Sequence, residues 1–338
     1  MNEKKRIEYI DAIRGFGILL MLMGHIGFGR KFDYYIHAFH MPLFFFLSGY
    51  FYSEASINKT WKDYVERKFK TLILPYGVFG IINYLVWIML QLRAGNKFGL
   101  FNPLLRLISF NHEGLPIAGA LWFLTSLFFM DIIYFALNKY SKSMLSLSIS
   151  VASIALIGCL WTKLIPWRMP YTIDAALVGM GLCHIARLIR KYLPILYNVP
   201  NFGSIIFFFI ASAMLISVNG YVNMRTGKYA NIPLFWIIAV ANILAIWNVI
   251  RFIYEKWGNN FKHIYSWLED IGKYSIIYVC INQLDIWAIG VFQKRIEIYF
   301  SIEHTLAYQF YTLAILLLVL FIETRIIIET KLRVLIGK

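Results

Sequence analysis

The first apolar stretch of the chain carries three ionisable side chains, Asp11, Arg14 and His25. Ionisable groups are costly in a bilayer and usually face a bundle interior or a wet cavity. If this stretch is helical, Arg14 and His25 point to within about 20° of the same face, separated by a rise of about 16 Å. One stripe then offers a cation near one end and, toward the other, an imidazole that could act as a general base. Asp11 precedes Arg14 by one turn and can pair with it.

Each of these side chains also has a structural explanation. Arg14 could be a snorkelling anchor at the helix end, held by an ion pair with Asp11. His25 could make a hydrogen bond to a serine or tyrosine of a neighbouring helix. The spacing alone leaves the structural and the functional interpretation open for both residues.

Two further clusters begin the next apolar segments. His37 and His40 are one helical turn apart, which could suggest a metal pair, but no carboxylate or cysteine stands at ligand spacing nearby, so we expect no metal. Arg67 and Lys70 lead into the third apolar segment, where basic residues commonly fix membrane orientation. They could also hold the phosphates of a cytosolic ligand.

The composition places these residues in a membrane protein. Of the 338 residues, 59% are hydrophobic and 15% are charged, whereas soluble proteins carry about 25% charged residues. A helix that spans the bilayer needs about 20 mostly apolar residues. We predict an all-α, polytopic bundle that forms one domain over residues 1–338. Its ten helices are expected at 9–28, 35–53, 71–92, 118–137, 144–161, 173–189, 202–218, 233–252, 273–290 and 306–327.

The basic residues predict the orientation of the bundle. Ten crossings place both termini on one side, and Lys and Arg are more frequent in the segments on that side, beginning with Lys4, Lys5 and Arg6. This bias favours cytoplasmic termini. Because the cations lie in short segments between apolar runs, the net charge of +15 indicates attraction to the bilayer surface rather than to nucleic acid.

Several motifs are absent. The sequence contains no P-loop, no G-x-G-x-x-G, no G-x-S-x-G and no H-E-x-x-H, which argues against nucleotide-driven pumping, serine hydrolysis and zinc proteolysis. None of the seven histidines is followed at the fifth position by aspartate. The acyltransferase box of soluble enzymes is therefore missing.

The residues described above nevertheless resemble the acyltransferase 3 family of integral membrane acyltransferases, most closely its fucose 4-O-acetylase-like branch. Arg14 and His25 match the opening signature of that family, in which ten positions separate a basic residue from a histidine. Arg67 and Lys70 match its basic entrance to the third helix, with lysine where arginine is commoner. The other similar segments are 6–15, 39–49, 75–76, 122–124 and 219–224.

One position departs from the family pattern. Residues 271–275 resemble a late element that family members often follow with a histidine, and here Asn282 stands about where that histidine would fall. If the histidine contributes to catalysis elsewhere, this chain uses an amide in its place or lacks the role.

The resemblance implies transfer of an acetyl or other short acyl group from acyl-CoA to a carbohydrate hydroxyl. The acceptor would be a cell-envelope or exopolysaccharide sugar, which a lipid could carry, and the enzyme a multi-pass protein of the bacterial cytoplasmic membrane. Arg14, Arg67 and Lys70 would hold the phosphates of acetyl-CoA. His25 would be the general base or would itself carry the acetyl group. His40 would position the acceptor or the thioester, and Asp11 would complete the catalytic set.

Two other functions fit a polytopic bundle. A transporter or flippase would also place charges in the membrane, but the sequence lacks the internal repeat with paired Gly/Pro-interrupted segments that many transporters show. A scaffold for a glycan-assembly enzyme is the third interpretation.

Overall fold

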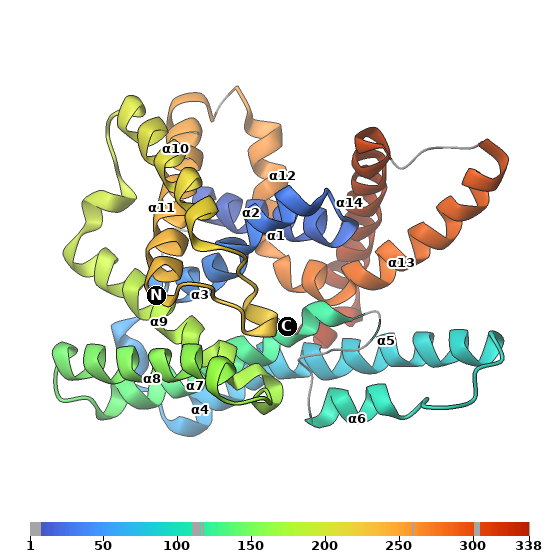
Figure 1. Ribbon diagram of the computed structural model, residues 1–338, viewed down its shortest axis with the longest axis horizontal. Helices are drawn as coiled ribbons and strands as arrows, with labels where there is room; N and C mark the ends of the chain where they lie inside the picture. The colour runs from blue at the N-terminus through green and yellow to red at the C-terminus, as the bar shows by residue number, and fades with distance from the viewer. Residues whose placement is uncertain (1–7, 110–115, 117, 259, 301–304, 338) are drawn as a thin grey trace.

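The computed structural model describes residues 8–109, 116, 118–258, 260–300 and 305–337 (Figure 1). Lys4, Lys5 and Arg6, which entered the orientation argument, lie outside these ranges. The described residues form helices and no strand beyond one isolated bridge between Asn223 and Lys228. The α-helices are α1 (Glu8–Ile26), α2 (Arg30–His37), α3 (His40–Tyr50), α4 (Trp61–Lys68), α5 (Leu74–Arg93), α6 (Asn102–Ser109), α7 (Trp122–Tyr140), α8 (Met144–Leu164), α9 (Ile173–Tyr192), α10 (Phe202–Asn219), α11 (Ile232–Trp257), α12 (Lys262–Lys273), α13 (Ser275–Phe300) and α14 (Leu306–Glu329).

The all-α, polytopic prediction is confirmed. Within the described part of the chain, nine helical stretches are long and apolar enough to cross a membrane. They are Tyr9–Ile26, Trp61–Arg93, Gly119–Tyr140, Met144–Leu164, Pro170–Tyr192, Phe202–Asn219, Ile232–Trp257, Ser275–Lys294 and Leu306–Glu329. Helices α10 and α11 pack together, and α13 and α14 contact each other on the opposite side of the view in Figure 1.

The prediction of a single helix at 35–53 is wrong. The chain forms α2 and then α3, with a break at Ala38 and Phe39, whose φ of −144° is not helical. Of α2, only Tyr35, Ile36 and His37 fall inside the predicted span. The two residues at the break are themselves apolar, so hydropathy could not reveal it. Helix α3 has only 11 residues, yet it needs no lipid-facing length because nearly all of it is buried inside the protein.

Helix α3 still returns the chain to the side on which α1 begins. It runs antiparallel to α1: the first turn of α3 packs near Gly17, and Phe51, just after α3, lies 5.6 Å from the Arg14 guanidinium. The C-terminal turn Lys331–Ile336 packs against the segment Phe69–Ile73, beside the same end of the bundle. The described chain therefore begins and ends near the same end of the bundle.

Glycines allow some of these helices to touch backbone to backbone. A Cβ atom at Gly49 in α3 would overlap the carbonyl oxygen of Cys183 in α9. A Cβ atom at Gly15 in α1 would overlap the carbonyl oxygen of Leu268 in α12. Close approach of this kind is how small residues stabilise membrane helix pairs.

We expect Gly49→Ala to lower the thermal stability of the detergent-solubilised protein, because overpacking a tight contact costs about 1–3 kcal/mol. The matched control is Gly77→Ala in α5, where nothing lies within 4 Å of the added atom. That variant should melt at or above the wild-type temperature, since alanine favours helix over glycine by about 1 kcal/mol. Fluorescence-detected unfolding would compare the two. Equal melting temperatures would contradict the packing argument.

Candidate active site

Two cavities follow the polar face of α1. The inner cavity has a volume of about 690 Å³ and is lined by Arg14 among others. The outer cavity has a volume of about 40 Å³ and is lined by His25. Phe44, Phe123 and Val279 line both cavities. These three apolar side chains therefore contribute to the walls of both cavities, and we refer to them as the shared wall.

Cations dominate the inner cavity. Arg14, Lys59, Arg67 and Lys68 line it, and Asp131 is the one carboxylate among its described lining residues. The Lys68 ammonium donates to Asp131 at 2.5 Å. Partial burial, with the nearby charges of Arg67 and Lys68, lowers the pKa of Lys59. A cation whose neighbours disfavour its charge gains from a bound anion, so this cavity suits a phosphate-bearing ligand.

The segment that follows α3 forms part of the wall of the inner cavity, and two arginines of α9 hold it in place. Arg187, which is 2% exposed, donates to both carboxylate oxygens of Glu54, at 2.5 and 3.0 Å. Arg190 donates to the carbonyl oxygens of Tyr50 and Tyr52, the latter at 2.7 Å. In the sequence, Arg187 and Arg190 stand out only as part of the basic residues that predict membrane orientation. Their role depends on contacts more than a hundred residues away in sequence, which local patterns do not reveal.

Asp11 lies beside Arg14 and not beside His25. Arg14 Nη1 donates to Asp11 Oδ1 at 3.1 Å, and the Asp11 side chain is 10% exposed. His25 lies fourteen helical steps beyond Asp11, a rise of about 21 Å. The carboxylate can therefore position Arg14, but the structure does not bring it to the imidazole.

Lys70 does not line the inner cavity. Its ammonium donates to Glu66 at 2.6 Å, and both side chains are at least half exposed. Residues three apart share a face in a regular α-helix. Here a π-turn occupies Phe69–Ile73, and its wider winding carries Lys70 away from Arg67. The cavity contains Lys59 and Lys68 instead.

Asn282 orients the His25 imidazole. The Asn282 amide nitrogen donates to the carbonyl oxygens of Tyr278, at 2.6 Å, and Val279, at 3.0 Å. Asn282 Oδ1 therefore faces His25 and lies 2.7 Å from its Nδ1. Since an amide oxygen only accepts, the proton must be on Nδ1, which leaves the lone pair of Nε2 available for a substrate.

The other two histidines of the outer cavity are also held through Nδ1. In His40, which is buried, Nδ1 lies 2.7 Å from the Ile36 carbonyl oxygen. In His37, Nδ1 lies 2.9 Å from the Asp33 carbonyl oxygen. The rings of His37 and His40 are 4.9 Å apart and nearly perpendicular. In the described parts of the chain, no group of three or more His, Cys, Asp or Glu residues could hold a metal ion.

The sequence left open whether Asn282 has a role at the site, and the structure shows that it contacts His25. We expect Asn282→Leu to reduce turnover by about 10²-fold, because His25 loses the acceptor that fixes its tautomer. Asn282→Asp should retain most activity, since a carboxylate oxygen can accept the same proton. Steady-state kinetics of the acyl transfer that the family resemblance implies, measured with purified variants, would test this. Equal losses in both variants would show that Asn282 acts only in packing.

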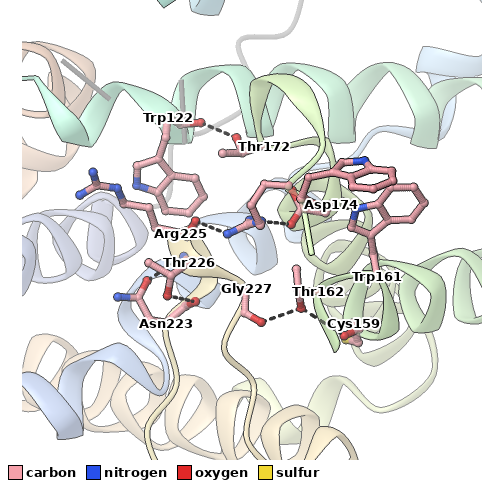
Figure 2. A network of polar contacts seen from close by, with 12 residues as sticks. Trp122, Cys159, Trp161, Thr162, Thr172, Asp174, Asn223, Arg225, Thr226 and Gly227 are labelled. Atoms are coloured by element: carbon pink, nitrogen blue, oxygen red, sulfur yellow. Dashed lines mark hydrogen bonds and ion pairs between the residues drawn. The ribbon is translucent and has the colours of Figure 1, made fainter. Parts of the chain in front are cut away.

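Arg225 is a charged wall residue of the outer cavity that sequence analysis missed. It follows directly after the segment 219–224 noted for its family resemblance, and that position was the available signal. Figure 2 shows the Arg225 side chain next to Trp122, pointing away from the buried Asp174. Trp122 and Asn223 line the same cavity.

Comparison with known proteins adds one positive finding. A family model described as an acyltransferase domain matches residues 7–324. No curated protein and no solved structure matches the chain.

Proposed function

Because the chain belongs to the acyltransferase 3 family of membrane acyltransferases, we propose that it moves an acetyl group from acetyl-CoA to a carbohydrate hydroxyl. The observation that carries this proposal is the pair of cavities with one shared wall. A cationic cavity lies on one side of that wall, and an oriented imidazole lies on the other.

The inner cavity suits the phosphate end of CoA. Arg14, Lys59 and Arg67 would bind phosphate oxygens, as arginine and lysine commonly do. The pantetheine arm would then pass Phe44, Phe123 and Val279, and its extended length is comparable to the helical rise of about 16 Å between Arg14 and His25. The bundle would sit in a bacterial cytoplasmic membrane with this cavity facing the cytosol.

The outer cavity suits a short acyl group. Its volume of about 40 Å³ exceeds the roughly 10–15 Å³ that one water molecule requires, but leaves room for only a few non-hydrogen atoms. An acetyl group meets that limit, whereas a long acyl chain or a sugar ring does not. The acceptor would therefore approach from outside this cavity and insert only its hydroxyl.

His25 would act as the general base. Nε2 takes the proton of the acceptor hydroxyl while the hydroxyl oxygen attacks the thioester carbonyl. When the C–S bond breaks, the thiolate of CoA receives that proton from Nε2. The buried His40, held by Ile36, would orient the thioester. Transfer through an acetyl group carried on His25 uses the same geometry.

The test uses the whole protein in proteoliposomes. Radiolabelled acetyl-CoA is supplied with fragments of cell-envelope or exopolysaccharide glycans, free and lipid-linked, and label is measured in the glycan. Transfer of label is the expected result. If no glycan is labelled while a solute or glycan crosses the vesicle membrane, the protein is a transporter and the proposal fails. Glycan analysis of a deletion strain for one missing O-acetyl group would identify the acceptor.

A further inference from the structure

Arg225 is the one permanently charged side chain among the described residues that line the outer cavity. Its guanidinium group lies against Gly119: a Cβ atom at Gly119 would come within 3.0 Å of Arg225 Nη1. The absence of a side chain at position 119 therefore leaves the space that the guanidinium occupies.

The turn that carries Arg225 is fixed on both sides. Asn223 and Lys228 exchange backbone hydrogen bonds of 2.7 and 3.0 Å. The Gly227 carbonyl oxygen accepts from the Thr162 hydroxyl at 2.7 Å. Arg225's own carbonyl oxygen accepts from Arg168 at 2.6 Å (Figure 2).

Arg168 is in turn held by a buried ion pair. It donates through Nε to Asp174, a residue with no exposed surface. Breaking such a pair is costly because it leaves a charge buried without its partner. The guanidinium of Arg225 is therefore presented from a rigid turn, and not from a mobile loop. Rigid placement is what electrostatic stabilisation of a transition state requires.

We propose that Arg225 is a catalytic residue that donates hydrogen bonds to the carbonyl oxygen of the acyl group during transfer. This inference rests on the proposed function. As the acceptor oxygen forms its bond to the carbonyl carbon, the C=O electron pair moves onto the carbonyl oxygen, and the guanidinium stabilises that negative charge. The pair returns when the C–S bond breaks and CoA leaves.

The size of the cavity favours this role over recognition of an anionic sugar. About 40 Å³ accommodates the reacting group but not a uronic acid ring. His25 lines the same cavity, so a carbonyl group placed there is next to both the base and the guanidinium. If Arg225 recognised the acceptor, its substitution would instead raise the KM of the acceptor.

The test compares Arg225→Ala and Arg225→Lys with wild type in the transfer assay. We expect Arg225→Ala to lower kcat by about 10²-fold or more, as loss of one oxyanion donor does, with the KM values for acetyl-CoA and acceptor nearly unchanged. Arg225→Lys should recover part of the loss, and added guanidinium ion should partly rescue Arg225→Ala.

Gly119→Ala provides a second, milder variant. It should lower kcat severalfold by displacing the guanidinium, and it should have no further effect in the Arg225→Ala background. A loss confined to the KM of the acceptor, or an unchanged kcat in Arg225→Ala, would overturn the inference. These outcomes require a wild-type protein that transfers, so a failure of the proposed function would be recognised first and separately.

Discussion

Replacing His25 by glutamine should lower acyl transfer by about 10²–10⁴-fold, which is the usual contribution of a general base. Glutamine preserves bulk and hydrogen bonding but cannot accept a proton from a hydroxyl. Binding of CoA in the inner cavity, measured by calorimetry or by thermal stabilisation, should be unchanged, since the cations that line that cavity are untouched.

The control is His37→Gln, the same substitution in the wall of the same cavity, which should cost less than tenfold. Transfer that persists in His25→Gln would remove His25 from the mechanism. A second experiment distinguishes a general base from a covalent acetyl carrier. Wild-type protein is mixed with labelled acetyl-CoA without acceptor, and the reaction is quenched with denaturant. Label that stays on His25 indicates a covalent relay, and its absence indicates a general base.

Val279→Trp should abolish detectable transfer while CoA still binds. Val279 lines both cavities. A bulky indole at this position would block the proposed route of the pantetheine arm, so the thioester could not reach His25. Overpacking costs about 1–3 kcal/mol, so folding is checked by thermal unfolding. Val279→Ala only removes volume from the shared wall and should retain activity within a fewfold.

Transfer at the wild-type rate by a folded Val279→Trp protein would contradict the route through the shared wall. The donor would then reach His25 from another direction. The His25→Gln experiment would still decide the role of the imidazole, so the two variants test separate parts of the proposal.

Local patterns in the sequence were sufficient for the class of protein and for the face of α1. Hydropathy over about 20 residues reports a span, and helical periodicity places Arg14 and His25 on one stripe. Both properties depend only on neighbours along the chain. Each residue indeed lines a cavity.

Local patterns did not predict the two places where the backbone departs from a regular α-helix. Ala38 and Phe39, at the break between α2 and α3, are themselves apolar, so hydropathy does not mark the break. The π-turn at Phe69–Ile73 changes which cations face the cavity, and Lys68 lines it in place of Lys70. A regular helical repeat predicts the opposite, because it assumes uniform winding.

Only the tertiary structure decided what surrounds the polar face of α1. Asn282 contacts His25 across 257 positions of sequence, and Arg225 reaches the same cavity from the turn between α10 and α11. Such contacts are set by how helices pack, and packing depends on the shapes of all neighbours at once. The sequence by itself thus determined a membrane helix with a cation and an imidazole on one face, and the fold determined the partners that make that face a candidate active site.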